Sequence, residues 1–168
     1  MPDLARLVAR IVLRMRGQIP PNHMAAILDS IPVDASGVLN VPWGSTRAEV
    51  LAIAPKPIVD SILAKPGKNP DILRGRASLG GHSAAYTFML DPSGFYSLAV
   101  GLLQPCPTMN QVVSAKYGSA RLEWPMPGPE QHTRWVGDGF EVLTELTRYH
   151  TGSLVFQRPR RSVSLDAR

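Results

Sequence analysis

The sequence predicts an α+β fold, in which a meandering antiparallel sheet of about six to eight strands carries two helices on one face. Three observations support this prediction. Apolar and polar residues alternate in several segments at the period of a half-buried strand. Short turns rich in glycine, proline and aspartate separate these segments, and such short connections allow only antiparallel pairing. Two other segments begin with a threonine at capping-box spacing, which is typical of helix starts.

Length and composition fit one globular domain with a neutral body. The chain has 168 residues, 44 % of them hydrophobic, and a single cysteine, so its core must form without a disulfide framework. The net charge of +5 is concentrated at the ends, because residues 1–16 and 158–168 each carry +3 and residues 17–157 carry −1. Any anion binding through the terminal arginines should therefore be separable from the folded body.

We expect three regions: a basic amphipathic helical arm over residues 1–20, a single α+β domain over 21–157, and a basic tail over 158–168. The apolar residues of the arm recur at helical spacing with arginines opposite them, so the arm either packs on the domain or binds a partner or an anionic membrane. No secretory signal or transmembrane stretch is visible, which predicts a cytoplasmic protein, with an import-type N-terminal helix as the alternative. The basic residues of interest at the two ends are Arg6, Arg10, Arg14, Arg158, Arg160 and Arg161.

Three helices are predicted in the domain. A short one covers residues 22–31, with Asn22 as its N-cap. The second begins with the Thr46 to Glu49 capping box and is limited by Pro55. The third begins with a similar box at residues 108–111 and ends at Gly118, which suits a left-handed conformation. The two boxes align, and this predicts a duplicated helix-then-hairpins unit.

The strands follow these helices. In the first half, strands over residues 73–79, 84–90 and 95–103 are joined by a Gly80-Gly81 hairpin turn and a turn at 91–94. On the third of these strands, one face is expected to carry the following residues: Tyr96, Leu98, Val100 and Leu102. In the second half, strands are expected at 135–136, 140–149 and 153–157, with Leu154 and Phe156 facing inward.

A resemblance to known families rests on short motifs between residues 40 and 157. Trp43-Gly44-Ser45-Thr46 runs into Glu49-Val50, strands follow, a helix ends at Tyr117-Gly118, and Trp135 comes later. This order resembles the SmpA/OmlA-like outer-membrane assembly domains and the β-lactamase-inhibitory-protein type. The resemblance implies protein binding through the sheet face and loops, without catalysis. Members of those families are exported, whereas this sequence shows no recognisable export signal.

One segment suggests catalysis. Gly81-His82-Ser83-Ala84-Ala85 is close to the Gly-x-Ser-x-Gly nucleophile elbow, but Ala85 replaces the last glycine and a strand pattern follows in place of a helix. The alternative function is a small serine hydrolase in which Ser83 is the nucleophile and His132 or His150 the base. The competing interpretation is a Gly-Gly hairpin with Ser83 on a strand.

We expect no cofactor and no metal. The four histidines are scattered, without a spacing that places two ligands together. Cys106 lies between two prolines with no adjacent base, so we expect a buried, unreactive thiol.

Two sets of residues are predicted to bind a partner. The loop over residues 122–130 contains three prolines and either displays Trp124 and Met126 or folds Trp124 back onto the core. Arg74 and Arg76 share one strand face. Our leading hypothesis is a non-enzymatic domain that binds another protein through its sheet face and this loop. The further alternative is binding of nucleic acid or an anionic membrane through the basic termini.

Overall fold

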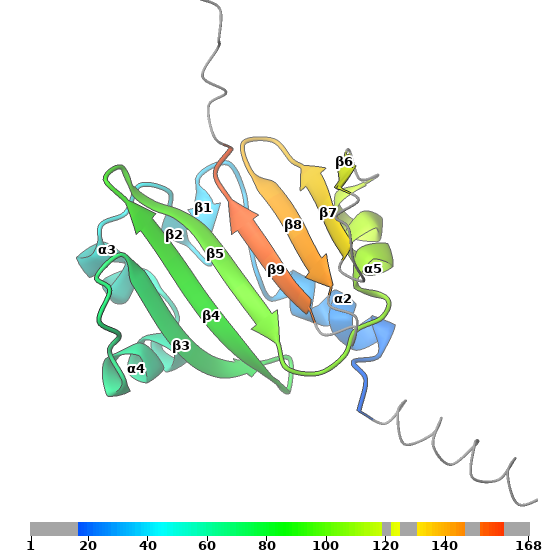
Figure 1. Ribbon diagram of the computed structural model, residues 1–168, viewed down its shortest axis with the longest axis horizontal. Helices are drawn as coiled ribbons and strands as arrows, with labels where there is room; N and C mark the ends of the chain where they lie inside the picture. Colours follow the sequence, from blue (N-terminus) through cyan, green and yellow to red (C-terminus); the bar gives the residue numbers. More distant parts are fainter. Residues whose placement is uncertain (1–16, 119–121, 125–130, 147–151, 160–168) are drawn as a thin grey trace, which may run out of the picture.

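A computed structural model describes residues 17–118, 122–124, 131–146 and 152–159, and Figure 1 shows their arrangement. The described elements follow in this order: α2 (Pro21–Asp29), β1 (Gly37–Val38), β2 (Val41–Pro42), α3 (Arg47–Ile53), α4 (Lys56–Ala64), β3 (Ile72–Leu79), β4 (His82–Asp91), β5 (Gly94–Leu102), α5 (Met109–Tyr117), β6 (Leu122–Trp124), β7 (Gln131–Val136), β8 (Glu141–Leu146) and β9 (Gly152–Gln157).

Seven strands form one antiparallel sheet in the order β3-β4-β5-β9-β8-β7-β6, and β1 pairs with β2 separately. The predicted α+β class and antiparallel sheet are confirmed. The central pairing joins β5 to β9, so the first hairpins and the last ones meet in the middle of the sheet. Gly80 and Gly81 have φ values of 58° and 81°. A two-residue hairpin loop of type I′ requires positive φ at both of these positions, and glycine adopts it readily.

A β-bulge corrects one predicted face. The register between β4 and β5 shifts at Met89/Leu90, which leaves Tyr96 as the extra residue on β5. The prediction that Tyr96 shares a face with Leu98 is therefore wrong, and Phe95 is buried in its place. Beyond the bulge the alternation is as predicted, with Leu98, Val100 and Leu102 buried.

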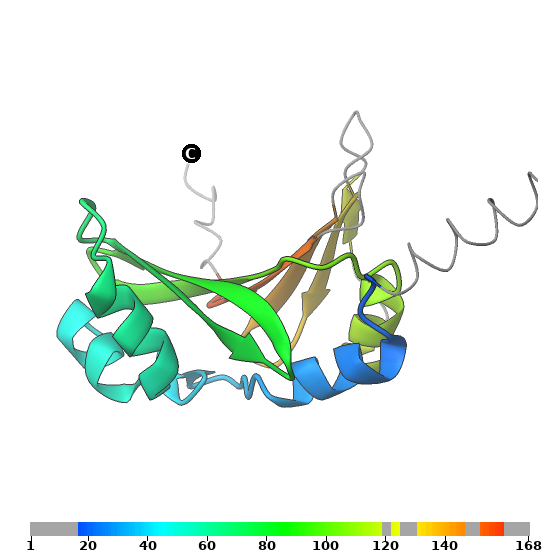
Figure 2. The same ribbon diagram turned by 90° about the horizontal axis from the view of Figure 1, so that it is seen from below.

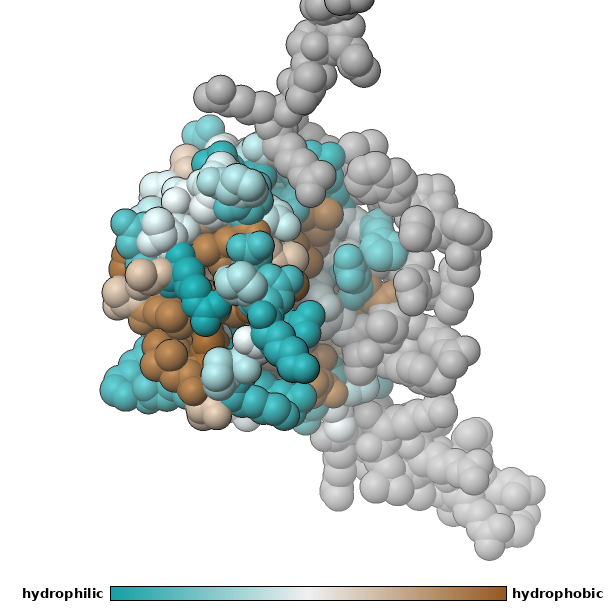
Figure 3. All heavy atoms as spheres, turned by 60° about the vertical axis from the view of Figure 1, so that its left-hand side comes forward, coloured by the Kyte–Doolittle hydropathy of each residue, from teal (hydrophilic) through white to brown (hydrophobic). Residues whose placement is uncertain are grey.

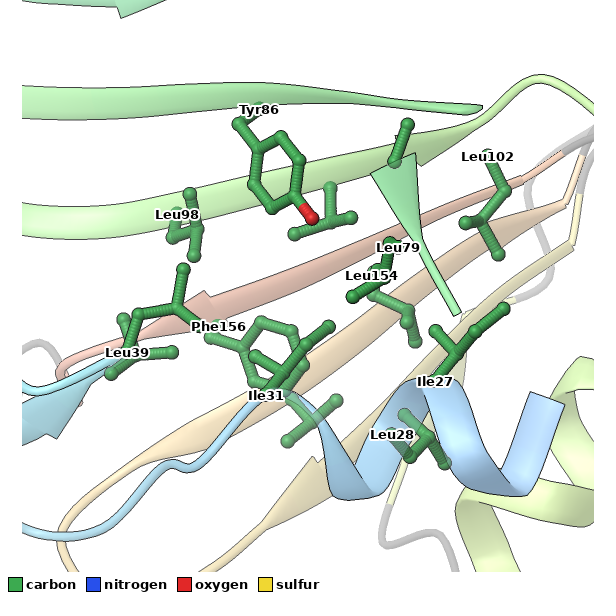
Figure 4. Packing of buried hydrophobic residues seen from close by; sticks show 14 of the residues in the cluster. Ile27, Leu28, Ile31, Leu39, Leu79, Tyr86, Leu98, Leu102, Leu154 and Phe156 are labelled. Atoms are coloured by element: carbon green, nitrogen blue, oxygen red, sulfur yellow. The ribbon is translucent and has the colours of Figure 1, made fainter. Parts of the chain in front are cut away.

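All described helices lie on one side of the sheet, and no described helix covers the other side, which we call the open face (Figure 2). The core fills the space between them. In Figure 4, Ile27 and Leu28 of α2 and the following Ile31 face Leu154 and Phe156 of β9. Leu79, Tyr86, Leu98 and Leu102 belong to the same buried cluster.

The helix starts are partly as predicted. At α3 the capping box is complete, because Thr46 Oγ1 accepts from the Glu49 amide and Glu49 Oε2 accepts from the Thr46 amide at 2.7 Å. The prediction of a second capping box is wrong, because Thr108 has φ −96° and ψ 10° and its side chain makes no capping hydrogen bond. Gly118 ends α5 at φ 86°, in the positive region expected for it.

The sequence did not predict α4 or the short strands β1, β2 and β6. Pro55, expected only to end α3, is also the N-cap of α4, and Pro57 lies in its first turn. Proline suits a helix start because the first amides have no intrahelical acceptor. One proline thus separates two helices. The second of them, α4, packs on the edge strand β3.

The packed domain extends slightly beyond residues 21–157. Ile19 is 2 % exposed, and its amide donates to the Pro105 carbonyl at 2.9 Å. Arg158 continues the pairing of β9, because its amide donates to the Tyr96 carbonyl. The predicted arm residues Arg6, Arg10 and Arg14 and the tail residues Arg160 and Arg161 lie outside the described residues. Of the helices in the described part, none is long and apolar enough to cross a membrane.

Close packing of α4 on β3 depends on Gly75. A Cβ atom there would lie 2.8 Å from the Ile58 carbonyl oxygen and 2.9 Å from Ile62 Cγ1. We expect Gly75→Ala to lower the free energy of unfolding by about 1–3 kcal/mol, because the helix must move away from the strand.

Gly101→Ala is the matched control, since Gly101 also lies within a strand but its Cβ would meet nothing closer than 3.9 Å. We expect this change to stay within about 0.5 kcal/mol of the wild type. Urea denaturation measures both, and equal stabilities for the two variants would contradict this packing.

Candidate binding surface

The open face of the sheet is lined by side chains that alternate with the core residues. Its middle is shallow, because small residues occupy neighbouring positions on β4 and β5: Ala85 pairs with Gly101, and Thr87 pairs with Ala99. Val155 and Ser153 of β9 continue these two rows, and both are half-buried. Small side chains let a partner approach the sheet closely.

At the β3 edge this face deepens into a groove of about 520 Å³. The segment between α4 and β3 rises above the sheet beside β3 and forms the outer wall (Figure 2). We call this site the β3 groove, and its lining is Ser61, Lys65–Asn69, Ile72, Arg74–Arg76 and Ala85–Thr87.

Hydrogen bonds hold this edge in place. The Arg76 amide points outward from β3 and donates to Ser61 Oγ of α4 at 2.7 Å. The Arg47 guanidinium donates to the Pro70 carbonyl, and Asn69 Oδ1 accepts from the Asp71 amide. The groove is therefore built on a strand, a helix end and a bonded loop.

The β3 groove is cationic. Lys65, Lys68, Arg74 and Arg76 line it, are all exposed, and none makes an ion pair with any carboxylate of the described residues. No aspartate or glutamate is among its lining residues. In Figure 3, which turns this edge of the molecule forward, hydrophilic side chains run between hydrophobic ones. The groove therefore offers positive charge that the described part of the chain does not neutralise.

The opposite end of the open face differs. Arg134 of β7 donates to Glu141 Oε1 of β8, and Gln157 donates to Glu141 Oε2 at 3.0 Å. His132 Nδ1 lies 3.9 Å from Glu145 Oε1. There Arg134 is paired with a carboxylate of the sheet itself, whereas Arg74 and Arg76 form no ion pair with the described residues.

The described residues of the hydrolase alternative, Ser83 and His132, are not brought together. Ser83 is exposed on β4, opposite Ser78. His132 is on β7, four strands along the sheet, which corresponds to roughly 19 Å at the usual strand spacing. His150 lies outside the described residues. The ring of His82 contacts His23 and Gln104 instead. The competing interpretation, a hairpin with Ser83 on a strand, matches the observed β3–β4 turn.

Of the predicted loop 122–130, the first part is a strand. Residues 122–124 form β6, which pairs with β7 so that Trp124 is opposite His132. The expectation that the whole segment is a loop is wrong at this point, because these three residues extend the sheet. The side chain of Trp124, and all of Met126, lie outside the described part of the structure.

Cys106 is fully buried, and burial raises the pKa of its thiol above the ordinary value. A higher pKa reduces the thiolate fraction near neutral pH, and the thiolate is the reactive form. We expect no reaction of the folded protein with Ellman's reagent at pH 8 and one reacting thiol after unfolding in guanidinium chloride. Equally fast reaction in both states would show that the thiol is accessible.

The two ends of the open face should respond differently to loss of a charge. Arg134→Gln leaves Glu141, which is 4 % exposed, without its cation, so we expect the free energy of unfolding to fall by about 1–3 kcal/mol. Arg74→Gln removes no ion pair within the described part of the chain, and we expect a change within about 0.5 kcal/mol. Urea denaturation tests both variants. A large loss for Arg74→Gln would mean that this arginine is structural.

Comparisons with known proteins add one structural likeness. No family model and no curated protein matches the sequence. Among solved structures, the fold is similar to that of a DUF4309 family protein, YjgB, from Bacillus subtilis subsp. subtilis str. 168. The two chains share 10 % identity with a TM-score of 0.55, over 83 % of this chain and 97 % of that one. At this identity the likeness shows the fold alone, and the resemblance to SmpA/OmlA-like and β-lactamase-inhibitory-protein domains stays a prediction.

Proposed function

We propose that this protein is a non-enzymatic binding domain that holds an acidic segment of another protein on the open face of its sheet. The observation that supports this most is the β3 groove, where four cations without an ion pair among the described residues line a depression on a face that no described helix covers. Carboxylate side chains are the protein groups that such a site would attract.

The two arginines are suited to carboxylates. They lie two residues apart on β3, so both project from the open face. A planar guanidinium binds a carboxylate through two parallel hydrogen bonds, whereas a lysine acts as a flexible point charge. Arg74 and Arg76 would therefore fix the position of an acidic segment, and Lys65 and Lys68 on the outer wall would add attraction.

The groove suits a peptide better than nucleic acid or a membrane. Binding of single-stranded nucleic acid relies on exposed aromatic rings for base stacking, but the one aromatic residue in the lining, Tyr86, is buried in the core. Insertion into a membrane needs exposed apolar anchors, and none of the large exposed hydrophobic residues of the described part lines the groove. The body of the chain is also nearly neutral, which disfavours a broad polyanion footprint.

Two expectations from the sequence remain parts of this proposal. Trp124 and Met126 would add a second contact beyond the far edge of the sheet, where β6 lies. The protein would bind this partner in the cytoplasm. Basic residues at the ends of the chain would raise the association rate of an acidic partner without deciding where it binds.

The test uses the full-length chain and a fluorescein-labelled peptide of twelve alternating glutamate and valine residues, followed by fluorescence anisotropy at low salt. We expect Arg74→Gln and Arg76→Gln each to weaken binding about threefold and the double variant about tenfold, in line with exposed ion pairs. Lys56→Gln is the matched control, because Lys56 is an exposed cation on the neighbouring helix that pairs with Asp60 outside the groove. Its affinity should equal that of the wild type.

Parallel measurements separate the alternatives. Tighter binding of a duplex DNA oligonucleotide or of phosphatidylserine vesicles, lost on deletion of residues 1–16 and 158–168, would replace the proposal with the basic-termini alternative. Equal peptide binding by the wild type and the Arg74/Arg76 double variant would overturn the groove as the anchoring site. A loss of affinity in Trp124→Ala with Met126→Ala would support the additional contact, and no loss would exclude it.

A further inference from the structure

We propose that His23 and His82, which are not among the residues lining the β3 groove, form a binding site for a divalent transition-metal ion of the Zn²⁺ type. His23 is in the first turn of α2, and His82 is the first residue of β4. They are 59 residues apart in sequence, yet Nδ1 of His23 lies 3.3 Å from Nε2 of His82. Because the two histidines are far apart in the sequence, their spacing could not predict that they meet in the fold.

The distance between the two nitrogens fits one shared ion. Zinc–nitrogen bonds are about 2.0–2.1 Å long, so two nitrogens 3.3 Å apart would subtend an angle of about 104–111° at the metal, close to tetrahedral. The ring centroids are 5.5 Å apart and the ring planes meet at 53°. In the hydrogen bond between the two rings, Nδ1 of His23 is the donor, so metal binding requires its proton to move to Nε2. His23 is exposed, so solvent can exchange this proton and the ring can tilt, which turns a lone pair of each histidine toward one ion.

Gln104 prepares His82 as a ligand. The Gln104 side-chain oxygen contacts Nδ1 of His82, and because this oxygen can only accept, the proton of the imidazole must be on Nδ1. The lone pair of His82 is then on Nε2, the atom that faces His23. A hydrogen bond from the second ring nitrogen to an oxygen is the usual way in which proteins orient a metal-binding histidine.

The two histidines are held by separate parts of the fold. His82 directly follows the Gly80-Gly81 turn, and Ile27 of α2 packs beside Gly80, where a Cβ would lie 3.1 Å from Ile27 Cγ1. The helix start and the hairpin are therefore fixed next to each other before any ion binds. Within the described residues no third histidine, cysteine or carboxylate joins them in a cluster, so water would complete the coordination and the ion would exchange readily.

Isothermal titration of the full-length protein with Zn²⁺ tests the site. We expect His23→Ala and His82→Ala each to weaken Zn²⁺ binding more than tenfold, and Gln104→Leu to weaken it roughly tenfold, as for loss of an outer-shell hydrogen bond. His132→Ala is the matched control and should bind as the wild type does. Because protons compete for the imidazoles, the affinity should fall on acidification.

A second measurement distinguishes loss of the metal site from loss of the fold. Zn²⁺ should raise the thermal midpoint of the wild type and of His132→Ala, but not that of the His23→Ala/His82→Ala double variant, whose own fold is checked by circular dichroism. If Zn²⁺ binds the folded double variant as tightly as the wild type, the ion is bound elsewhere and the proposed site is wrong. If no variant of the set, including the wild type, binds Zn²⁺, the proposal also fails.

Discussion

The described helices pack against one face of the sheet, and this packing determines which face is free to meet another molecule. Large side chains on that face, such as Phe88, Phe95 and Phe156, are fully buried, and each contributes roughly 1.5–3 kcal/mol of hydrophobic stabilisation. The sheet cannot present this face to a partner without losing that energy. In our proposal the partner therefore binds the open face and the margin where the segment after α4 rises above it.

Side chains of β3 alternate between the core and the open face, and this alternation puts the cationic side chains of the groove on the open face. Gly75 faces α4 and lets the helix approach β3, so its neighbours Arg74 and Arg76 must point to the opposite face. The hydrogen bond from the Arg76 amide to Ser61 and the rising segment after α4 then enclose this end of the face. At the far end, Glu141 neutralises Arg134. Within the described residues, one end of the sheet thus contains an ion pair and the other end carries cations that form none.

Much of the fold could be predicted from the sequence, because period-two alternation and turn residues are local signals. They located β3, β4, β5 and β9 to within a few residues. What escaped prediction depends on non-local or competing effects. The bulge at Met89/Leu90 is set by strand pairing, the start of α4 uses a proline that also ends α3, and the Thr108 side chain does not cap its helix. For the β3 groove, the sequence placed Arg74 and Arg76 on one strand face, but only the tertiary structure shows that Lys65 and Lys68 line the same groove. The contact between His23 and His82 also could be found only in the tertiary structure.

Chemical-shift mapping tests whether the open face at β3 is the surface that binds an acidic peptide. The full-length ¹⁵N-labelled chain would be titrated with the glutamate–valine peptide while its amide signals are followed. We expect the largest shifts within residues 65–76 and 85–87, which line the groove, and little change in α2 and α5 on the covered side. Shifts concentrated on the helices, with the β3 amides unmoved, would contradict this account.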